Sequence, residues 1–487
     1  MSATPVATAE YVVVGAGSGG CAVAGRLAEA GRDVLLVEAG PDYGPFDSGN
    51  WPDEFLDARA MPTVTHDWGY AAGRWKFERA RIMGGCSSHN GAIAATGQRA
   101  EYDAWNLPGW SGDDVAPVFA RVLERMRVRA YERHEAGPFH ERCLLAAEAL
   151  GWPIASDLCD LDAGSSFGLE TVNVVGTTRW NAAFAYVDPV RDRLRIIDRA
   201  IASRFEWGEA GVRLHLIRNG EPIEVHAGTL IIASGAYGTP ALLERSGVGN
   251  PAALHDAGVA STHRLLGVGA NLHDHPMVHA DRRVGPQLQQ WLDDAAAAGY
   301  LPEEQTLGKF ATRHSPDGRY DVHVFPVCAS TQTSVLHGRV HVEVACMDVR
   351  SRGSVHIRSG DPETAPKIDH RYLSDRAGHD LQVLREGVKI AEQLLSHPQL
   401  AEVLGEKITD MTYEAAYYET VSHYYHPVGT CAMGDEYLSV CDARGRVRGL
   451  PQVMVADASL MPQIVRANTN IPTVMIGERI ADFILGG

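Results

Sequence analysis

The first part of the chain alternates short apolar runs with segments of small residues. Tyr11–Val14 and Val34–Val37 are apolar and rich in β-branched residues, so each predicts a strand. The small residues between them predict a helix that ends near Gly31. A strand, a glycine-rich turn, a helix and a second strand in this order predict the first unit of a Rossmann-like α/β domain.

The middle of the chain contains alternating runs in quick succession, at Ile201–Phe205, Val212–Ile217 and Ile223–Val225. Their spacing predicts a small antiparallel excursion within the same domain. The apolar run Thr229–Ala233 then predicts the strand that returns to the nucleotide domain.

The C-terminal half has a different pattern. Gln287–Ala298 predicts a helix, whereas Asp321–Val327, Val340–Met347 and Ser354–Arg358 alternate as strands with one buried face do. Asp380–Leu395 places its apolar residues on one stripe, which predicts an amphipathic helix covering these strands. We therefore expect a second domain built on an antiparallel sheet, consistent with 487 residues exceeding one typical core.

Composition narrows the possible partners. The chain has 44 Lys and Arg against 61 Asp and Glu, and the formal charge of −17 argues against nucleic acid or an anionic membrane. The first apolar stretch lacks a basic flank and no apolar run is long enough for a bilayer, so we expect neither signal peptide nor membrane span. The 8 cysteines lack C-x-x-C spacing, which favours a reduced, cytoplasmic protein without a zinc site.

The turn after the first strand carries the pattern G-x-G-x-x-G at Gly15, Gly17 and Gly20. The first glycine allows a tight turn, the second lets a pyrophosphate approach the backbone, and the third lets helix and strand pack closely. The helix N-terminus offers free N–H groups to phosphates, and Glu38 can accept hydrogen bonds from a ribose diol. The unit predicts a dinucleotide site and leaves NAD and FAD open; a glycine-rich turn in an ordinary α/β protein is the alternative.

Further motifs lie at residues 81–91 (RIMGGCSSHNG), 235–249 (GAYGTPALLERSGVG), 265–276 (LLGVGANLHDHP), 422–434 (SHYYHPVGTCAMG), 455–462 (VADASLMP) and 466–473 (RANTNIPT). In their order along the chain, these motifs resemble those of the glucose-methanol-choline (GMC) oxidoreductases, which are FAD enzymes. The run Gly84–Asn90 is most similar to choline oxidase-like members of that family.

The resemblance implies a Rossmann-like FAD-binding domain with an interleaved α+β substrate domain on an antiparallel sheet. It assigns residues 8–157, 190–283 and 426–487 to the FAD-binding domain, and 158–189 and 284–425 to the substrate domain. It makes His426 and Asn468 the catalytic residues. The implied FAD-binding residues are Gly15, Gly17, Ser18, Gly20, Glu38, Ala39, Arg81, Gly84, Gly85, Ser88, His89, Asn90, Ala202, Ala233, Gly235, Asp457, Ala458, Asn468, Pro472 and Thr473.

The resemblance also suggests how some of these residues work. His89 lies where choline oxidase-like members bond a histidine covalently to the flavin, although a histidine merely packed beside the ring is the alternative. Neutral imidazole at His426 would take an alcohol proton, and Asn468 would hold the same oxygen. A core histidine and a helix cap, which Asn470 could supply equally well, are their alternatives. Pro472 fits the start of a last helix, whose positive end would stabilise reduced flavin.

Other features are open to more than one interpretation. His273, Asp274, His275 and His279 suggest a metal cluster, but no completing ligand is evident and we expect no metal site. Two pairs of adjacent residues, Arg179-Trp180 and Tyr424-Tyr425, could line the substrate cavity, or their aromatic rings could belong to the core. Residues 41–80 have little periodicity and predict an irregular cover, and Glu244-Arg245 could form an ion pair at a domain seam.

The sequence thus predicts an FAD-dependent oxidoreductase that converts an alcohol to a carbonyl by proton transfer to His426 and hydride transfer to flavin N5. Oxygen or another acceptor would take the electrons, and the protein would be a monomer or a dimer. No confidently placed acidic residue with an aromatic cage for a quaternary ammonium group is evident. The alternative is a hydroxynitrile lyase-type enzyme in which FAD has no redox role.

Overall fold

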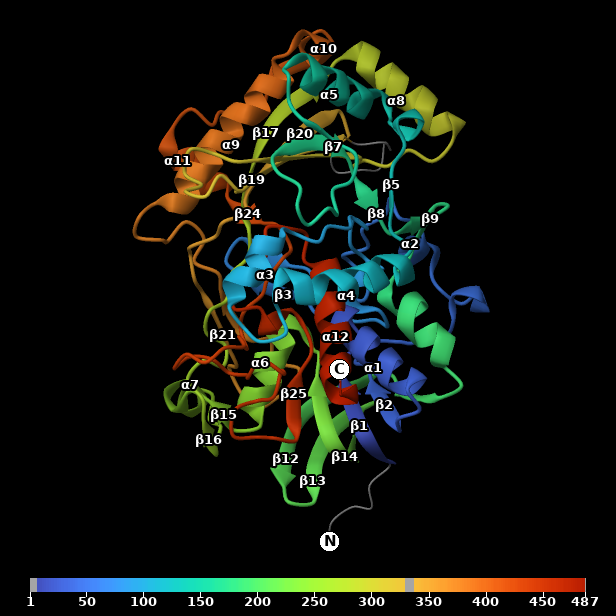
Figure 1. The fold of residues 1–487 in the computed structure, drawn as a ribbon, viewed down its shortest axis with the longest axis vertical. Coiled ribbons are helices and arrows are strands. Elements are labelled where there is room, and N and C mark those ends of the chain that lie inside the picture. Colours follow the sequence, from blue (N-terminus) through green and yellow to red (C-terminus); the bar gives the residue numbers. More distant parts are fainter. Residues whose placement is uncertain (1–6, 329–336, 487) are drawn as a thin grey trace.

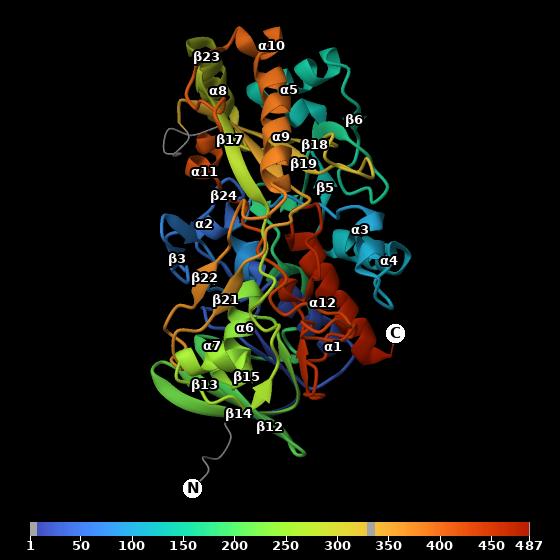
Figure 2. The same ribbon diagram turned by 90° about the vertical axis from the view of Figure 1, so that its left-hand side faces the viewer.

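The computed structural model describes residues 7–328 and 337–486. Two large sheets lie one above the other along the longest axis (Figure 1). The lower sheet holds mainly strands of the N-terminal half and the upper sheet mainly strands of the C-terminal half, with the same arrangement in the side view (Figure 2). This confirms the predicted fold class of a nucleotide-binding sheet plus a second, largely antiparallel sheet.

The lower sheet has 7 strands. Their order is β11 (Leu194–Ile197), β2 (Val34–Val37), β1 (Ala7–Val14), β14 (Glu221–Ile232), β13 (Gly211–Arg218) and β12 (Ala200–Gly208), with β25 (Val453–Val455) also beside β14. The pairs that include β1, β2 or β25 are parallel, whereas β12, β13 and β14 pair antiparallel. The predicted antiparallel excursion is therefore present and joins the parallel sheet directly.

Helices α1 (Ser18–Glu29) and α12 (Asn470–Leu485) pack side by side on this sheet (Figure 1). Their contact is close because glycines face each other: a Cβ on Gly477 would overlap the carbonyl oxygen of Gly19. The side chain of Glu478 on α12 is fully buried, and it pairs with Arg26 of α1. The two helices therefore form one rigid unit with both of their N-termini at the same end.

The upper sheet has 8 strands. Their order is β23 (Leu404–Lys407), β17 (Pro276–Val284), β20 (Arg339–Cys346), β19 (Val322–Cys328), β18 (Thr306–Phe310), β7 (Ser166–Leu169) and β6 (Ile154–Ala155), with β24 (Ser422–His423) also beside β17. Helix α9 (His379–Leu395) covers one face, where a Cβ on Gly387 would lie 2.5 Å from side-chain carbons of Val322 and Val344. The predicted amphipathic helix is therefore present.

Two details of this part differ from the expectation. Ser354–Arg358 was expected in the antiparallel sheet, but β21 (Ser354–His356) pairs with β22 (Lys367–Asp369) in a separate ribbon. Alternation shows that one face of a strand is buried, and it does not show against which partner. The expected domain bounds stay a prediction. They placed residues 276–283 in the FAD-binding domain, whereas β17, which contains these residues, pairs within the upper sheet.

The remaining segments are short. Residues 41–80 form a mostly irregular cover with two brief helices and a hairpin. The elements outside the two sheets include η1 (Phe46–Ser48), α2 (Asp53–Leu56), β3 (Tyr70–Ala72), β4 (Trp75–Phe77), η2 (Gly85–Ser88), α3 (Arg99–Trp105), α4 (Gly112–Arg125), α5 (Pro138–Ala149), α6 (Gly235–Arg245), α7 (Pro251–Asp256), α8 (Pro286–Ala298), α10 (Pro398–Ala401), α11 (Glu414–Thr420) and η6 (Ala458–Leu460). Within the described ranges, every helix is too short or too polar to cross a bilayer.

Close packing at the first turn leads to a test of fold stability. A Cβ on Gly20 would overlap the carbonyl oxygen of Gly15 and lie 3.1 Å from the Cβ of Ala233. We expect Gly20→Ala to lower the free energy of unfolding by about 3 kcal/mol, measured by urea titration, because backbone must move. Gly208→Ala is the control: nothing lies within 4 Å of its added Cβ. Equal stability of the two variants would contradict the packing described.

Candidate functional site

The first glycine turn is the centre of the predicted cofactor site. Helix α1 begins at Ser18 with Gly17 as its N-cap, and no side chain caps its first N–H groups. Ser18 Oγ donates a hydrogen bond to Asn470 Oδ1 at 2.7 Å, which brings the start of α12 beside the start of α1. Both helices therefore direct the positive ends of their dipoles to one place, as an anionic pyrophosphate or flavin requires.

The second glycine-rich motif lies directly against the first. Gly84 N donates to the carbonyl oxygen of Ala16 at 2.7 Å, and a Cβ on Gly85 would lie 2.6 Å from Gly17 Cα. Among the described residues outside its chain neighbours, the one atom within 4 Å of a Cβ on Gly17 is Gly85 Cα, at 4.0 Å. The site beside this turn is therefore bare backbone with open space, which fits the close approach of a phosphate.

Glu38 follows β2 and is buried. Its Oε2 accepts a hydrogen bond from Ala16 N and its Oε1 accepts one from Gly40 N, each at 2.8 Å. Burial raises the pKa of Glu38 to about 7, although these backbone bonds oppose the shift. Each carboxylate oxygen keeps a second lone pair, so the predicted bond to a ribose diol remains compatible with the structure.

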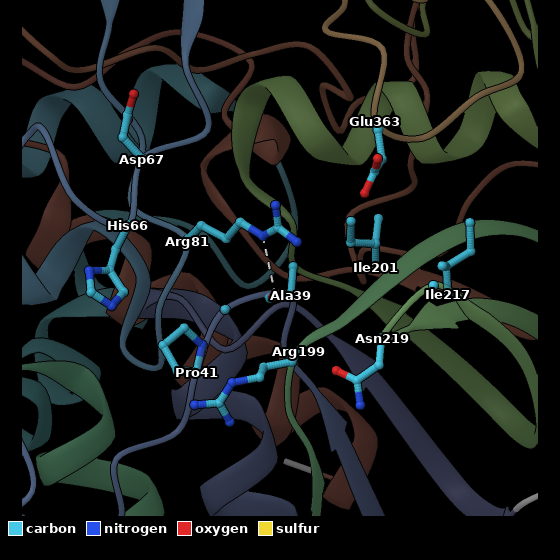
Figure 3. Close-up of a pocket in the computed structure, with 12 residues that line it drawn as sticks. Ala39, Pro41, His66, Asp67, Arg81, Arg199, Ile201, Ile217, Asn219 and Glu363 are labelled. Atoms are coloured by element: carbon cyan, nitrogen blue, oxygen red, sulfur yellow. Dashed lines mark hydrogen bonds between the residues drawn. The ribbon is translucent and has the colours of Figure 1, made fainter.

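A cavity of about 460 Å³ opens next to this carboxylate, at the end of β2. Ala39 and Arg81 line it, and Arg81 Nε donates to the carbonyl oxygen of Ala39 at 3.2 Å (Figure 3). Arg199, Ile201 and Glu363 close other sides of the same cavity. Its position fits the nucleotide end of a dinucleotide whose pyrophosphate lies at the glycine turn.

Asp457 joins two segments that the resemblance assigns to the cofactor site. Its Oδ2 accepts hydrogen bonds from Gly235 N at 2.8 Å and Thr239 Oγ1 at 2.5 Å, and its Oδ1 accepts one from Ser459 N at 2.8 Å. It thus ties the start of α6 to η6, which begins at Ala458. Ala233 lies against Gly15 at the end of β14. Ala202 lies on β12, where its carbonyl accepts a bond from Arg245.

His89 lies at the end of the second glycine motif and is buried. Ser88 Oγ before it donates to the carbonyl of Met83, and Asn90 Oδ1 after it accepts from Ala92 N. Burial would raise the pKa of Cys86, but the charge of Arg79 and a hydrogen bond to His89 lower it to about 6. Arg79 and Cys86 were missed by sequence reasoning, which examined cysteines only for C-x-x-C spacing.

His426 lies in the motif at residues 422–434 and contacts the loop before β17. Its Nδ1 lies 3.0 Å from His275 Nδ1, and its backbone N donates to Asp274 Oδ1 at 2.9 Å. His275 Nε2 lies 3.1 Å from the carbonyl oxygen of Val465. The ring of Tyr424 meets the ring of His426 edge to face, with 4.8 Å between centroids.

These contacts determine where the protons are. Burial lowers the pKa of His275 to about 3, so this ring is neutral. The carbonyl of Val465 can only accept, so Nε2 of His275 carries the proton and its Nδ1 is bare. His426 must then donate from Nδ1, which leaves its own Nε2 with a free lone pair. Burial, followed by the charges of nearby histidines and Arg79, lowers the pKa of His426 well below 6.5.

Asn468 lies three residues beyond Val465, in the segment that leads into α12. Its Oδ1 is buried and has no hydrogen-bond partner among the described residues. The N-cap of α12 is Thr469, so Asn468 does not occupy the cap position. Pro472 and Thr473 lie in the first turn of α12, where Thr473 Oγ1 donates to the carbonyl of Thr469 at 2.6 Å. An unpartnered buried amide is expected to bind a ligand or water.

The four residues that suggested a metal cluster do not converge. His273 Nδ1 binds the carbonyl of Asn271 and its Nε2 accepts from Ile464 N, while Asp274 also accepts from Tyr372. With His275 bonded to His426, these three residues position the segment that contains His426. The sequence analysis considered Asp274 and His275 only as metal ligands and missed this positioning role.

Two pairs of adjacent residues make contacts other than those expected. Glu244 and Arg245 do not pair with each other: Glu244 binds His356 Nδ1 at 2.7 Å, and Arg245 donates to the carbonyls of Ala202 and Ser203. Consecutive residues on a helix point to different sides. Arg179 is buried and donates to carbonyls of the cover and of residues 88–90, and Trp180 belongs to the core. These two residues fasten the cover, whereas Tyr424 lies beside His426.

Comparison with known proteins agrees with this arrangement. Family models described as GMC oxidoreductase match residues 9–277 and 349–477. The chain is 31% identical to an oxygen-dependent choline dehydrogenase of Xanthomonas axonopodis pv. citri, over 98% of this chain and 95% of the relative. It is 30% identical to choline oxidase of Arthrobacter globiformis, over 98% and 94% of the two chains. The chain belongs to the GMC oxidoreductase family and is an enzyme of that family, for which FAD is the expected cofactor.

Solved structures share the fold. Pyridoxine 4-oxidase from Mesorbium loti superposes with a TM-score of 0.86 over 98% of this chain and 99% of that one, at 24% identity. A fungal aryl-alcohol oxidase superposes with a TM-score of 0.78 over 98% and 99%, at 19% identity. At such identities the likeness establishes the two-sheet architecture alone.

Proposed function

We propose that this enzyme oxidises an alcohol to a carbonyl compound with FAD as its cofactor. The observation that carries the proposal is the neutral, buried His426, whose Nε2 has a free lone pair because His275 accepts from its Nδ1. Relatives named for the oxidation of choline support an alcohol as the substrate. Oxygen and another electron acceptor remain alternatives for the final step.

The residues divide the work as follows. Nε2 of His426 accepts the hydroxyl proton, and the side-chain amide N–H of Asn468 donates a hydrogen bond to the same oxygen, so the carbon bearing the hydrogen is oriented. When bound, FAD supplies the acceptor for the hydride at its N5 position. Proton acceptance creates an imidazolium in a buried site, and Asp274 lies next to it, bonded to the backbone N of His426.

We also propose that His89 bonds covalently to the flavin. His89 follows the glycine motif that contacts the first turn, and it is buried next to the Arg79–Cys86 pair. Burial would raise the pKa of Cys86, but Arg79 and a hydrogen bond to His89 lower it to about 6, and this hydrogen bond would orient the imidazole. A bare ring nitrogen would bond to the methyl carbon of the flavin, with the hydrogen of that carbon leaving as a proton and its electron pair passing to the flavin, which the electron acceptor would reoxidise.

The walls near His426 favour a substrate with an apolar part. An apolar cluster on the face of the upper sheet opposite α9 includes Met277, Phe325 and Tyr424. The ring of Phe325 lies 6.4 Å from that of Tyr424, which in turn contacts His426. An aromatic, cyclic or otherwise bulky alcohol fits such walls.

Removal of the base tests the proposed reaction. In His426→Ala we expect substrate to bleach the flavin anaerobically about 10²–10⁴-fold more slowly, because no group accepts the proton. The measurement is stopped-flow absorbance of the flavin with a panel of alcohols. His255→Ala, at a side chain 90% exposed, is the control and should behave as wild type. Equal bleaching in both variants would refute the role; cleavage of a cyanohydrin without bleaching would indicate a lyase.

The pH dependence of kcat/KM tests the state of His426. Because the folded pKa of His426 lies well below 6.5, the ring is already a base at neutral pH. We expect kcat/KM to be constant above pH 6.5 and to fall only as acid protonates the ring. An acid limb with an apparent pKa of about 7.5 or higher, measured in steady state, would show that the ring is not held neutral by burial.

Acid precipitation tests the covalent bond. We expect the wild-type pellet to stay yellow and fluorescent, because a flavin bonded to His89 precipitates with the chain. In His89→Ala the flavin should pass into the supernatant, while the folded variant still shows a bound-flavin spectrum. Release of all flavin from the wild type would rule out the bond and leave His89 as a packed neighbour of the ring.

A further inference from the structure

A second cluster of ligand-type side chains lies on the upper sheet, apart from His426. His279 and Asp281 lie on β17 and His341 on β20, and the two strands are antiparallel neighbours. One donor atom from each of the three residues lies within 4.8 Å of those of the other two. Asp281 is directly opposite His341 in the register, and Glu343 is directly opposite His279.

Alternation along the strands places these side chains on one face. Val278 and Val342 belong to the core under α9, whereas Met277 and Ala345 belong to the apolar cluster on the opposite face. His279 and Asp281 continue the face of Met277, and His341 and Glu343 continue that of Ala345. Directly opposite side chains in an antiparallel pair have Cβ atoms about 5 Å apart, and diagonal neighbours are also within reach of long side chains. The three ligands therefore converge because of the register.

The cluster contains donor atoms that the protein itself does not pair. His279 Nδ1, Asp281 Oδ1 and His341 Nε2 are buried and have no hydrogen-bond partner among the described residues. Asp281 Oδ1 lies 3.1 Å from His341 Nδ1 without the geometry of a hydrogen bond. Burial of a polar atom without a hydrogen bond costs free energy of folding. Nitrogen and oxygen atoms with lone pairs that lie close together are typical ligands of one metal ion.

A hydroxyl group beside the cluster also suits a bound cation. Thr409 Oγ1 donates to Asp281 Oδ2 at 2.6 Å, which fixes the carboxylate with its Oδ1 directed toward His341. Outer contacts of this kind orient metal ligands in known sites.

We propose that His279, Asp281 and His341 bind one divalent transition-metal ion such as Zn²⁺. Two imidazoles and a carboxylate are ligands that zinc prefers, and the fourth position falls to Glu343 or to water. The ion would link β17 to β20 at residues about 7–14 Å along the strand from Met277, so it would stabilise the upper sheet without taking part in hydride transfer. The sequence analysis expected no metal site and considered His279 only together with residues 273–275, so the proposal departs from that expectation.

Another ligand-type cluster lacks these properties. Cys346, His379 and Asp380 also lie close together and are buried. The oxygens of Asp380 already accept hydrogen bonds from the backbone N of Arg350 and Ser351, and His379 pairs with Asp348. Because both carboxylate oxygens of Asp380 already accept backbone hydrogen bonds, that cluster carries no metal proposal.

Zinc binding by the flavin-containing enzyme tests the proposal. Protein without an affinity tag is dialysed against chelator, mixed with Zn²⁺, separated from free metal by gel filtration and measured by plasma mass spectrometry. We expect one retained Zn²⁺ per wild-type chain and a higher Tm with zinc than without it. Both effects should be lost in His341→Ala and in the isosteric Asp281→Asn.

Further variants make the result specific. His255→Ala removes an exposed histidine and should retain the metal, and Thr409→Val should weaken Zn²⁺ binding by about 10–100-fold because Asp281 loses its outer contact. Metal-free Tm and flavin absorbance show that each variant is folded. Failure of the wild type to retain zinc, or equal zinc in Asp281→Asn and wild type, would overturn the proposal. Neither result bears on alcohol oxidation, which is measured separately.

Discussion

The hydrogen bond between the Nδ1 atoms of His275 and His426 is the interaction on which the site depends. In a hydrogen bond between two neutral imidazoles, one ring donates and the other accepts. The carbonyl of Val465 accepts from His275 Nε2, so His275 must accept at Nδ1 and His426 must donate. Burial maintains both rings in the neutral form. The orientation of the proposed base is therefore determined by a backbone carbonyl in the segment before α12, so chemistry and fold are coupled through one peptide group.

That segment reaches the site because four stretches, far apart in the sequence, meet at backbone distance. Gly15 lies against Ala233, Gly17 against Gly85, and Gly19 against Ala456. A side chain in place of any of these glycines would force the contacting backbone segments apart. The same contacts bring the starts of α1 and α12 together, so two helix dipoles and bare N–H groups face one space. Cofactor affinity and the placement of the base therefore rest on the same packing.

Much of this could be predicted from the sequence where a local pattern has one physical solution. Val34–Val37 and Gln287–Ala298 have the expected structure because apolar runs and helical periodicity depend on neighbours in the chain. Ser354–Arg358 was assigned to the wrong sheet, because partner choice depends on tertiary packing. The His275–His426 bond joins residues 151 positions apart and leaves no local signature. The roles of individual cofactor residues remain predictions, since proximity to the glycine turns does not measure a contact with FAD.

The substrate side of the enzyme is hardest to infer for a specific physical reason. Every residue of β19, Val322–Cys328, is buried, since α9 covers one face and the nucleotide half lies against the other. A strand buried on both faces loses the alternation that would reveal which side chains face His426. Only the register decides that Phe325 rather than Val324 lies near Tyr424, and a shift by one residue would exchange the two faces. Substrate choice is therefore encoded in strand pairing, and the same pairing of β17 with β20 brings His279, Asp281 and His341 together.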